Sequence, residues 1–261
     1  MTERPPDIEL ARRFVAANPP PGRVLLCGIT GSHQYGFASA DSDLDIKGIH
    51  LAPTPTLLGL SPPAEAHQSL RRLDGIECDL TTNEAGQALR LLLRGNGNML
   101  ERIFSPFQLY ATPETVELRE LARGAISKTF FDHYAGFFRA MCREHEKASQ
   151  PVAKTLFYAY RVALTGIHLL RTGDLVADLS RLAPDHGFHQ ALELVALKRA
   201  SSENGGVGPD EDARHRRAWT RLSEELEAAR DRSPLPESPS NSSACEDWLI
   251  ALRVRELKVR Q

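Results

Sequence analysis

Apolar residues in the first part of the chain recur at two spacings, which predict helices and strands. The run Val24–Ile29 is almost wholly apolar and is bounded by glycines, as in a buried strand. The segment Leu44–Leu51 alternates, as in a half-buried strand. We therefore expect, in order, a helix over Ile8–Ala17, strands over Val24–Ile29, Leu44–Leu51 and Ile76–Leu80, and a helix over Asn83–Arg94, with a loop and at most one helical turn over residues 30–42.

From Pro113 onward the spacing becomes helical. A 3.6-residue period marks one amphipathic helix, built on Phe130, Phe131, Tyr134, Phe137, Phe138, Met141 and Cys142. We expect further helices over Pro151–Arg171, Glu211–Arg230 and Cys245–Val259. The pattern thus predicts a small unit of strands and helices up to about residue 110 and a mostly helical unit after it.

Composition narrows the class of protein. The chain has 261 residues, 41% hydrophobic and 25% charged, with a formal net charge of -2. A protein that coats long nucleic acid normally carries a basic surplus, so that class is disfavoured, whereas binding of one nucleotide or one RNA end is not. The four cysteines are scattered, the N-terminal residues lack a signal-like apolar core, and no apolar stretch is long enough for a membrane span. We expect a cytoplasmic protein with no membrane partner.

Two aspartates two residues apart are the strongest chemical signal. Strand geometry puts Asp43 and Asp45 on one face, while Leu44 and Ile46 point into the core. Two neighbouring carboxylates repel each other unless a cation lies between them, and Mg²⁺ prefers such oxygen ligands. The pair therefore predicts a metal site.

A pair of metal ions needs a third carboxylate to complete it. Asp79, between Cys78 and Leu80 on the next predicted strand, is our choice, and Glu77 on the same face stays open as the alternative. Lys47 lies on the Asp43/Asp45 face and is placed to balance the acidic charge.

The segment Gly31-Ser32 directly follows the first predicted strand. Glycine lets the backbone come close to a phosphate, and serine offers a hydroxyl and an N–H group to the same oxygens. His33 and Tyr35 follow in the loop, where either could contact a nucleotide or acceptor or be an ordinary loop residue. The loop lacks the Gly-Lys-Ser/Thr ending of a P-loop, which argues against a P-loop ATPase.

The combined spacing resembles the signature of the DNA polymerase beta superfamily of nucleotidyltransferases. Segments 31–36, 41–45, 91–101 and 154–173 resemble a bacterial branch of predicted nucleotidyltransferases that includes RNA-repair-pathway members, although Gly97 stands where proline is usual. The resemblance covers roughly residues 24–180. It implies an α+β fold: a palm-like mixed sheet with helices (catalytic domain, residues 1–110), then a mostly α-helical domain (residues 111–261). It also implies a nucleoside triphosphate donor such as ATP, with Mg²⁺ or Mn²⁺ on Asp43, Asp45 and Asp79.

A polar stripe follows the helix predicted over Pro151–Arg171, with Lys154, Tyr158, Arg161, Thr165 and His168 spaced 4, 3, 4 and 3 apart. Superfamily relatives often use their helical domain to hold the donor, so Lys154 and Arg161 are expected at the triphosphate and Tyr158 at the base or ribose. Together with Gly31, Ser32 and His33 they form the predicted nucleotide-binding set. The alternative interpretation of the stripe is the solvated face of an amphipathic helix.

Asn98 and Glu101 follow the helix that is expected to end near Gly95. Asn98 is expected to cap a helix, and Glu101 to be a surface or supporting group; a substrate contact stays open for both.

The leading hypothesis is an enzyme that transfers a nucleoside monophosphate to an acceptor hydroxyl and releases pyrophosphate. Asp43, Asp45 and Asp79 would carry the catalysis, with Asp79 lowering the pKa of the acceptor hydroxyl or accepting its proton. The acceptor, an RNA end, a protein hydroxyl or a small molecule, stays open. The alternative is a nucleotide-binding regulatory or antitoxin-like module without turnover. An aspartyl phosphatase fits less well, because its Asp-x-Asp pair directly follows the first strand, where the Gly-Ser loop stands here. A glycosyltransferase fits less well, because the chain is short for that class and the strand-flanked context of the pair differs.

Overall fold

The computed structural model describes residues 5–39, 42–149, 152–200 and 207–259, and contains a five-stranded mixed sheet in the order β3-β4-β2-β1-β5. Neighbouring strands are antiparallel except β2 and β4, which are parallel. The predicted α+β class with a mixed sheet followed by helices is confirmed. The strands are β1 (Arg23–Ile29), β2 (Leu44–Leu51), β3 (Ala66–Leu73), β4 (Ile76–Glu84) and β5 (Phe107–Ala111).

Contacts group the described chain into two compact units, which we call the sheet unit (residues 5–31, 42–125 and 239–259) and the helical unit (residues 32–39 and 126–238). The short helix α2 (Gly31–Gln34) begins in the first and continues in the second. The predicted domain ranges 1–110 and 111–261 remain a prediction. The other helices of the sheet unit are α1 (Ile8–Ala17), α3 (Thr54–Leu57), α4 (Ala85–Leu93), α5 (Gly97–Ile103), α6 (Pro113–Ala125) and α12 (Ser242–Val259).

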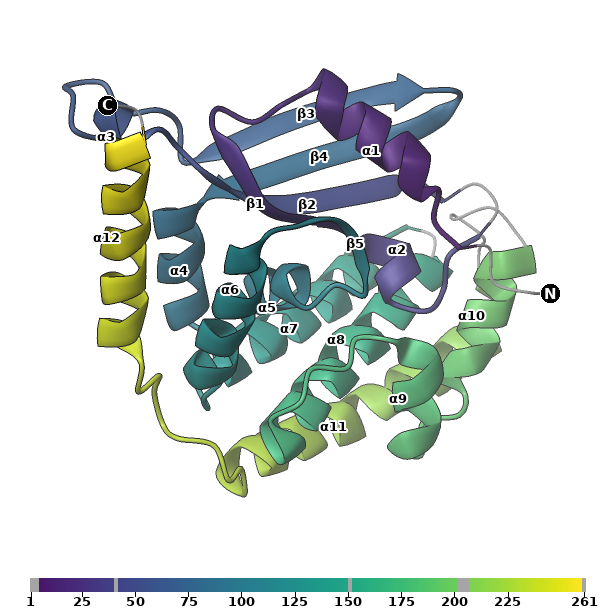
Figure 1. Ribbon diagram of the computed structural model, residues 1–261. Helices are drawn as coiled ribbons and strands as arrows, with labels where there is room; N and C mark the ends of the chain where they lie inside the picture. The colour runs from purple at the N-terminus through teal and green to yellow at the C-terminus, as the bar shows by residue number, and fades with distance from the viewer. Residues whose placement is uncertain (1–4, 40–41, 150–151, 201–206, 260–261) are drawn as a thin grey trace. The chain divides into compact units, whose positions relative to one another are not determined.

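Helix α1 covers one face of the sheet (Figure 1). Asp7 caps it by accepting a hydrogen bond of 2.9 Å from the Leu10 backbone N–H. Its apolar side packs on the residues of β1, β2, β4 and β5 that point the same way. The shared core consists of Leu10, Ala11, Phe14, Val15, Cys27, Ile29, Leu44, Ile46, Cys78, Leu80 and Leu109. Because side chains alternate along a strand, the intervening residues of β2 and β4 point to the opposite face.

The last helix of the sheet unit, α12, packs against α3, α4 and α6 of the same unit (Figure 1). Arg253 of α12 donates to both carboxylate oxygens of Glu84, at 3.0 and 2.9 Å, and the Glu84 side chain is only 7% exposed. Glu84 also caps α4 by accepting from the Gly86 N–H. A buried carboxylate of this kind depends on its cation.

We expect Arg253→Met to lower the free energy of unfolding by about 2 kcal/mol, because it leaves Glu84 buried without its positive partner. Arg255→Met, two residues along the same helix, is the matched control. Its ion pair with Glu117 spans 3.9 Å between exposed side chains, and its loss should cost less than about 0.5 kcal/mol. Urea unfolding of both variants measures the difference, and equal losses would contradict the role given to the Glu84 pair.

The helical unit is built around α8, which is buried along nearly its whole length. Gly166 lets it approach α7 closely, since a Cβ there would lie 2.6 Å from the Tyr134 side chain. The helix ends at Gly173, which has the left-handed conformation. The helices of this unit are α7 (Phe130–Lys147), α8 (Ala153–Thr172), α9 (Leu179–Asp185), α10 (Ala191–Ala200) and α11 (Pro209–Asp231).

The predicted helices and strands lie close to where they were expected, but the structure contains further elements that were not predicted. The helix over Ile8–Ala17 and the strand over Leu44–Leu51 have the predicted bounds, and the helical turn after the first strand is α2. The start predicted at Pro151 falls outside the described residues, and the helix is described from Ala153. Elements that the sequence pattern did not predict include α3, β3, α5, β5, α9 and α10. No helix in the described ranges is long and apolar enough to cross a bilayer.

Candidate metal and nucleotide site

Two of the predicted metal ligands lie directly opposite each other on neighbouring parallel strands. Asp45 of β2 pairs in register with Asp79 of β4, on the face that α1 does not cover. Their side chains are 37% and 41% exposed, so both carboxylates are open to solvent and to ligands. Asp43 immediately precedes β2 and is exposed. Glu77 lies on β4, two residues before Asp79. The register therefore favours Asp79 over Glu77 as the partner of Asp45.

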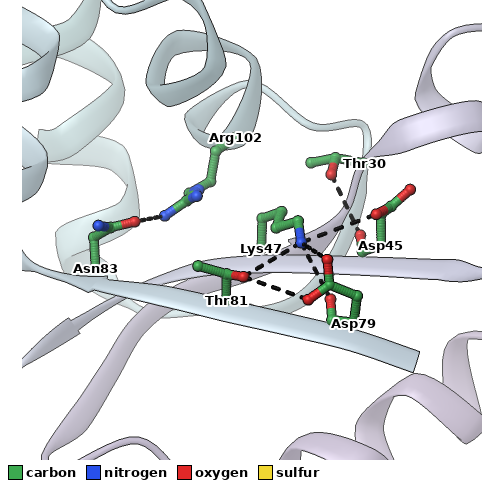
Figure 2. Close-up of polar contacts among 7 residues, drawn as sticks. All are labelled: Thr30, Asp45, Lys47, Asp79, Thr81, Asn83 and Arg102. Atoms are coloured by element: carbon green, nitrogen blue, oxygen red, sulfur yellow. Dashed lines mark hydrogen bonds and ion pairs between the residues drawn. The ribbon is translucent and has the colours of Figure 1, made fainter. Parts of the chain in front are cut away.

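Lys47 places a positive charge beside this pair (Figure 2). Its Nζ donates to Asp79 Oδ2 at 2.6 Å and lies 3.9 Å from Asp45 Oδ1. Thr81, next to Asp79 along the same face of β4, is 3.4 Å from the ammonium and donates to Asp79 Oδ1 at 3.5 Å. The two aspartates thus already share a cation, which fits the predicted role of Lys47 in balancing their charge.

The backbone of Gly31 lies against the Asp45 carboxylate. Its φ is 63°, and a Cβ built on it would lie 1.9 Å from Asp45 Oδ2. The preceding Thr30 fixes the same residue through its backbone N–H, which donates to the Asp45 carbonyl at 2.8 Å, and through its hydroxyl at 3.3 Å. The glycine therefore lets the carboxylate seat against the backbone, a role that the sequence did not indicate. Its predicted approach to phosphate stays a prediction.

The polar face continues along the strands beyond Lys47 (Figure 2). Asn83 of β4 accepts a hydrogen bond from Arg102 of α5, which also donates to the Gly48 carbonyl at 3.0 Å. Burial lowers the pKa of Arg102 to about 10, so its guanidinium stays charged at neutral pH. Thr81, Asn83 and Arg102 were missed by the sequence analysis, although the first two follow Asp79 at the period of a strand.

The remaining predicted nucleotide ligands belong to the helical unit. Ser32 and His33 lie in α2, and Lys154, Tyr158 and Arg161 lie in α8. They thus fall in a different compact unit from Gly31, Asp45 and Asp79. Their proposed contacts with a nucleotide stay predictions.

Arg161 is buried, with 1% of its surface exposed, and its guanidinium lies 4.0 Å from the ring centroid of Tyr35. Tyr35 also meets Tyr158 edge-on, with ring centroids 6.3 Å apart. Thr165 is wholly buried as well. The interpretation of the stripe as the solvated face of an amphipathic helix is therefore wrong at Arg161 and Thr165. The sequence pattern of α8 alone could not reveal this, because the covering residue Tyr35 lies more than a hundred positions earlier.

The segment that carries Tyr35 is held against the same unit by several contacts. The Tyr35 carbonyl accepts from the Leu179 N–H at 2.9 Å, and Phe37 packs on Phe157 with centroids 4.6 Å apart. Gly36 has a φ of 76°, and a Cβ there would lie 1.9 Å from Asp178 Oδ1. Gly36 is thus needed for packing within the helical unit.

Two expectations around residue 100 require correction. The residue that caps α5 is Asn96, whose side chain accepts from the Met99 N–H at 3.0 Å, and Asn98 is instead exposed in the first turn. Glu101 is 2% exposed, so it is no surface group. Gly97 is the first residue of α5, a position where proline is favoured, which explains how relatives can carry proline there.

A further set of potential metal ligands lies in the helical unit. Glu193, Glu211 and His215 bring ligand atoms within 4.8 Å of one another. Arg214 already forms an ion pair with Glu193, and Tyr160 lies 3.2 Å from His215 Nδ1. Two of the three side chains thus already have partners within the protein.

The chain is similar to a known protein family and to individual proteins. A statistical model of the RNA repair pathway DNA polymerase beta family (RlaP) matches residues 7–251. An uncharacterised protein of Methanocaldococcus jannaschii is 30% identical over 153 residues, which is 58% of this chain and 62% of that protein. The uncharacterised protein YcgL of Bacillus subtilis is 24% identical over 216 residues, covering 77% of this chain and 79% of YcgL. The first match thus spans about three fifths of the archaeal relative.

Among solved structures, a nucleotidyltransferase-like protein from Exiguobacterium sibiricum is similar, with 14% identity and a TM-score of 0.34. The likeness covers 85% of this chain and 74% of that one. It adds nothing to the description of the site.

Proposed function

Because the chain belongs to the RNA repair pathway DNA polymerase beta family, we propose that it transfers a nucleoside monophosphate from a nucleoside triphosphate to an acceptor hydroxyl, with release of pyrophosphate. The observation that carries the proposal is the pair Asp45 and Asp79, opposite each other on parallel strands with a cation between them. The family's description makes an RNA end the first acceptor to test.

The donor set fits Mg²⁺ or Mn²⁺. Asp45 and Asp79 offer hard carboxylate oxygens that are open to solvent, and the Lys47 ammonium stands in for a cation beside them. Asp43 would complete the set from the residue before β2. A divalent cation held there would stabilise the negative charge that develops on the phosphate oxygens.

The chain's own residues would then divide the remaining work. Asp79 is proposed to accept the proton of the acceptor hydroxyl, since its side chain is 41% exposed. Gly31 and Thr30 keep Asp45 in place. Lys154, Tyr158 and Arg161 are proposed to hold the donor, Lys154 as a point charge on the triphosphate. Arg161 is buried under Tyr35, so a phosphate contact requires Tyr35 to move.

The test is label transfer. The protein is incubated with Mg²⁺ or Mn²⁺ and each α-labelled triphosphate, with RNA, with protein or without added acceptor. We expect label to pass to one acceptor and pyrophosphate to appear in equal amount, and EDTA to stop both. Tight, metal-dependent nucleotide binding without transfer to any acceptor would replace the enzyme with a regulatory or antitoxin-like binding module.

A further inference from the structure

Lys47 holds Asp79 more closely than simple charge balance requires. Its Nζ is 2.6 Å from Asp79 Oδ2 and 3.4 Å from the Asp79 carbonyl oxygen. The Thr81 hydroxyl contacts Oδ1 of the same carboxylate. Both oxygens of Asp79 therefore have a donor within the protein (Figure 2).

The backbone fixes this arrangement. Lys47 pairs in register with Thr81, one strand repeat beyond the Asp45 and Asp79 pair, so its side chain leaves the same face of the sheet. The Lys47 side chain is 19% exposed, less than either aspartate. The ammonium is thus more buried than the two carboxylates that it contacts.

Such an ammonium competes with a metal ion. A divalent cation on Asp79 needs a lone pair of the same carboxylate, and the two positive charges would repel each other across a few ångströms. The repulsion is relieved when the ammonium leaves Asp79 and binds another anion. The phosphate oxygens of a triphosphate are the anions that the proposed reaction brings to this face.

We propose that Lys47 is a positioning residue that competes with a metal ion for Asp79. It occupies the cation position at Asp79 until a donor triphosphate arrives, and then passes from the carboxylate to the phosphate oxygens. Metal binding at Asp79 and triphosphate binding are therefore coupled, and by linkage each tightens the other. The inference rests on the proposed function for the identity of the donor.

Manganese binding tests the coupling without any turnover. Free Mn²⁺ is measured by electron paramagnetic resonance while it is titrated into the protein, with and without a non-hydrolysable triphosphate analogue. The analogue's own Mn²⁺ binding is measured in parallel and subtracted. For the unmodified protein we expect weak binding alone and roughly tenfold tighter binding with the analogue.

Lys47→Met removes the competing charge and keeps the length of the side chain. We expect it to bind Mn²⁺ alone roughly tenfold more tightly than the unmodified protein, and to gain little from the analogue. Lys47→Gln is also neutral but can still donate to Asp79, and it should show the same Mn²⁺ affinity. It replaces Lys47→Met in the experiment if that variant does not fold. Lys47→Arg keeps the charge and should keep the coupling.

The matched control is Lys128→Met. Lys128 also forms a 2.6 Å ion pair, with Glu237, and its side chain is 21% exposed. It belongs to the helical unit, and its loss should leave Mn²⁺ affinity and coupling unchanged. A purely structural role for Lys47 predicts a lower melting temperature with no gain in Mn²⁺ affinity.

The inference is overturned if the neutral Lys47 variants bind Mn²⁺ no more tightly than the unmodified protein does. It is also overturned if the analogue tightens Mn²⁺ binding by these variants as much as it tightens binding by the unmodified protein. This outcome is distinct from failure of the proposed function, because label transfer plays no part in the titration. Tighter Mn²⁺ binding by the neutral Lys47 variants, with no label transfer to any acceptor, would support the competition between Lys47 and metal and contradict the proposed enzyme activity.

Discussion

Replacing Asp45 with asparagine should abolish nucleotidyl transfer, lowering kcat by on the order of a thousandfold, while the protein stays folded. Asparagine has the same shape but no charge, so the pair of Asp45 and Asp79 loses one of the two charges that attract a divalent cation. The side chain is 37% exposed, which keeps the effect on stability small. Label transfer measures the loss, and thermal unfolding verifies the fold.

Asp74→Asn is the matched control for this result. Asp74 is an exposed aspartate of the same unit, in the β3–β4 turn, with an ion pair to Arg13. Its φ of 51° is one that asparagine also tolerates. Transfer should be unchanged in this variant. Asp79→Asn should resemble Asp45→Asn, and normal turnover in either would remove the carboxylate pair from the mechanism.

Gly31→Ala should lower transfer by on the order of a hundredfold, because the new methyl group would occupy the place of the Asp45 carboxylate. The Cβ would lie 1.9 Å from Asp45 Oδ2 and 2.7 Å from its Cγ, so the aspartate has to leave its position. Mn²⁺ affinity should fall together with turnover. A loss of turnover with unchanged Mn²⁺ affinity would contradict this explanation.

Gly75→Ala separates the collision from backbone strain. Gly75 has a φ of 83° and nothing within 4 Å of its added Cβ, so alanine there is strained but meets no neighbour. Both variants should lose about 1 kcal/mol of stability from the left-handed conformation. Only Gly31→Ala should also lose activity. Equal activity in the two variants would show that the contact with Asp45 is dispensable.

The placement of Asp45 and Lys47 on one face of the sheet could be predicted because it follows one short-range rule. Strand alternation alone placed Asp45 opposite the core residues and Lys47 on its side, and both lie there. The choice between Asp79 and Glu77 could not be made in this way. It depends on the register of the parallel β2–β4 pair, which is set by long-range packing.

The strand β3 shows why part of the fold was missed. It is polar and largely exposed, as an edge strand with one neighbour can be, so its hydrophobic pattern is weak. The missed signal is the dipeptide Asp74-Gly75, which forms a two-residue hairpin turn between Leu73 and Ile76. Arg161 shows a different limit, since its burial comes from Tyr35, a residue distant in sequence.

The place of α12 has a consequence for synthesis on the ribosome. The sheet unit takes its last helix from residues 242–259, although its strands are complete by residue 111. Glu84 meets Arg253, so the buried carboxylate that caps α4 lacks its cation until the whole helical unit has been made. The unit that carries the aspartates therefore finishes folding last. A chain released early would present the carboxylates on an incompletely packed scaffold that is open to proteolysis.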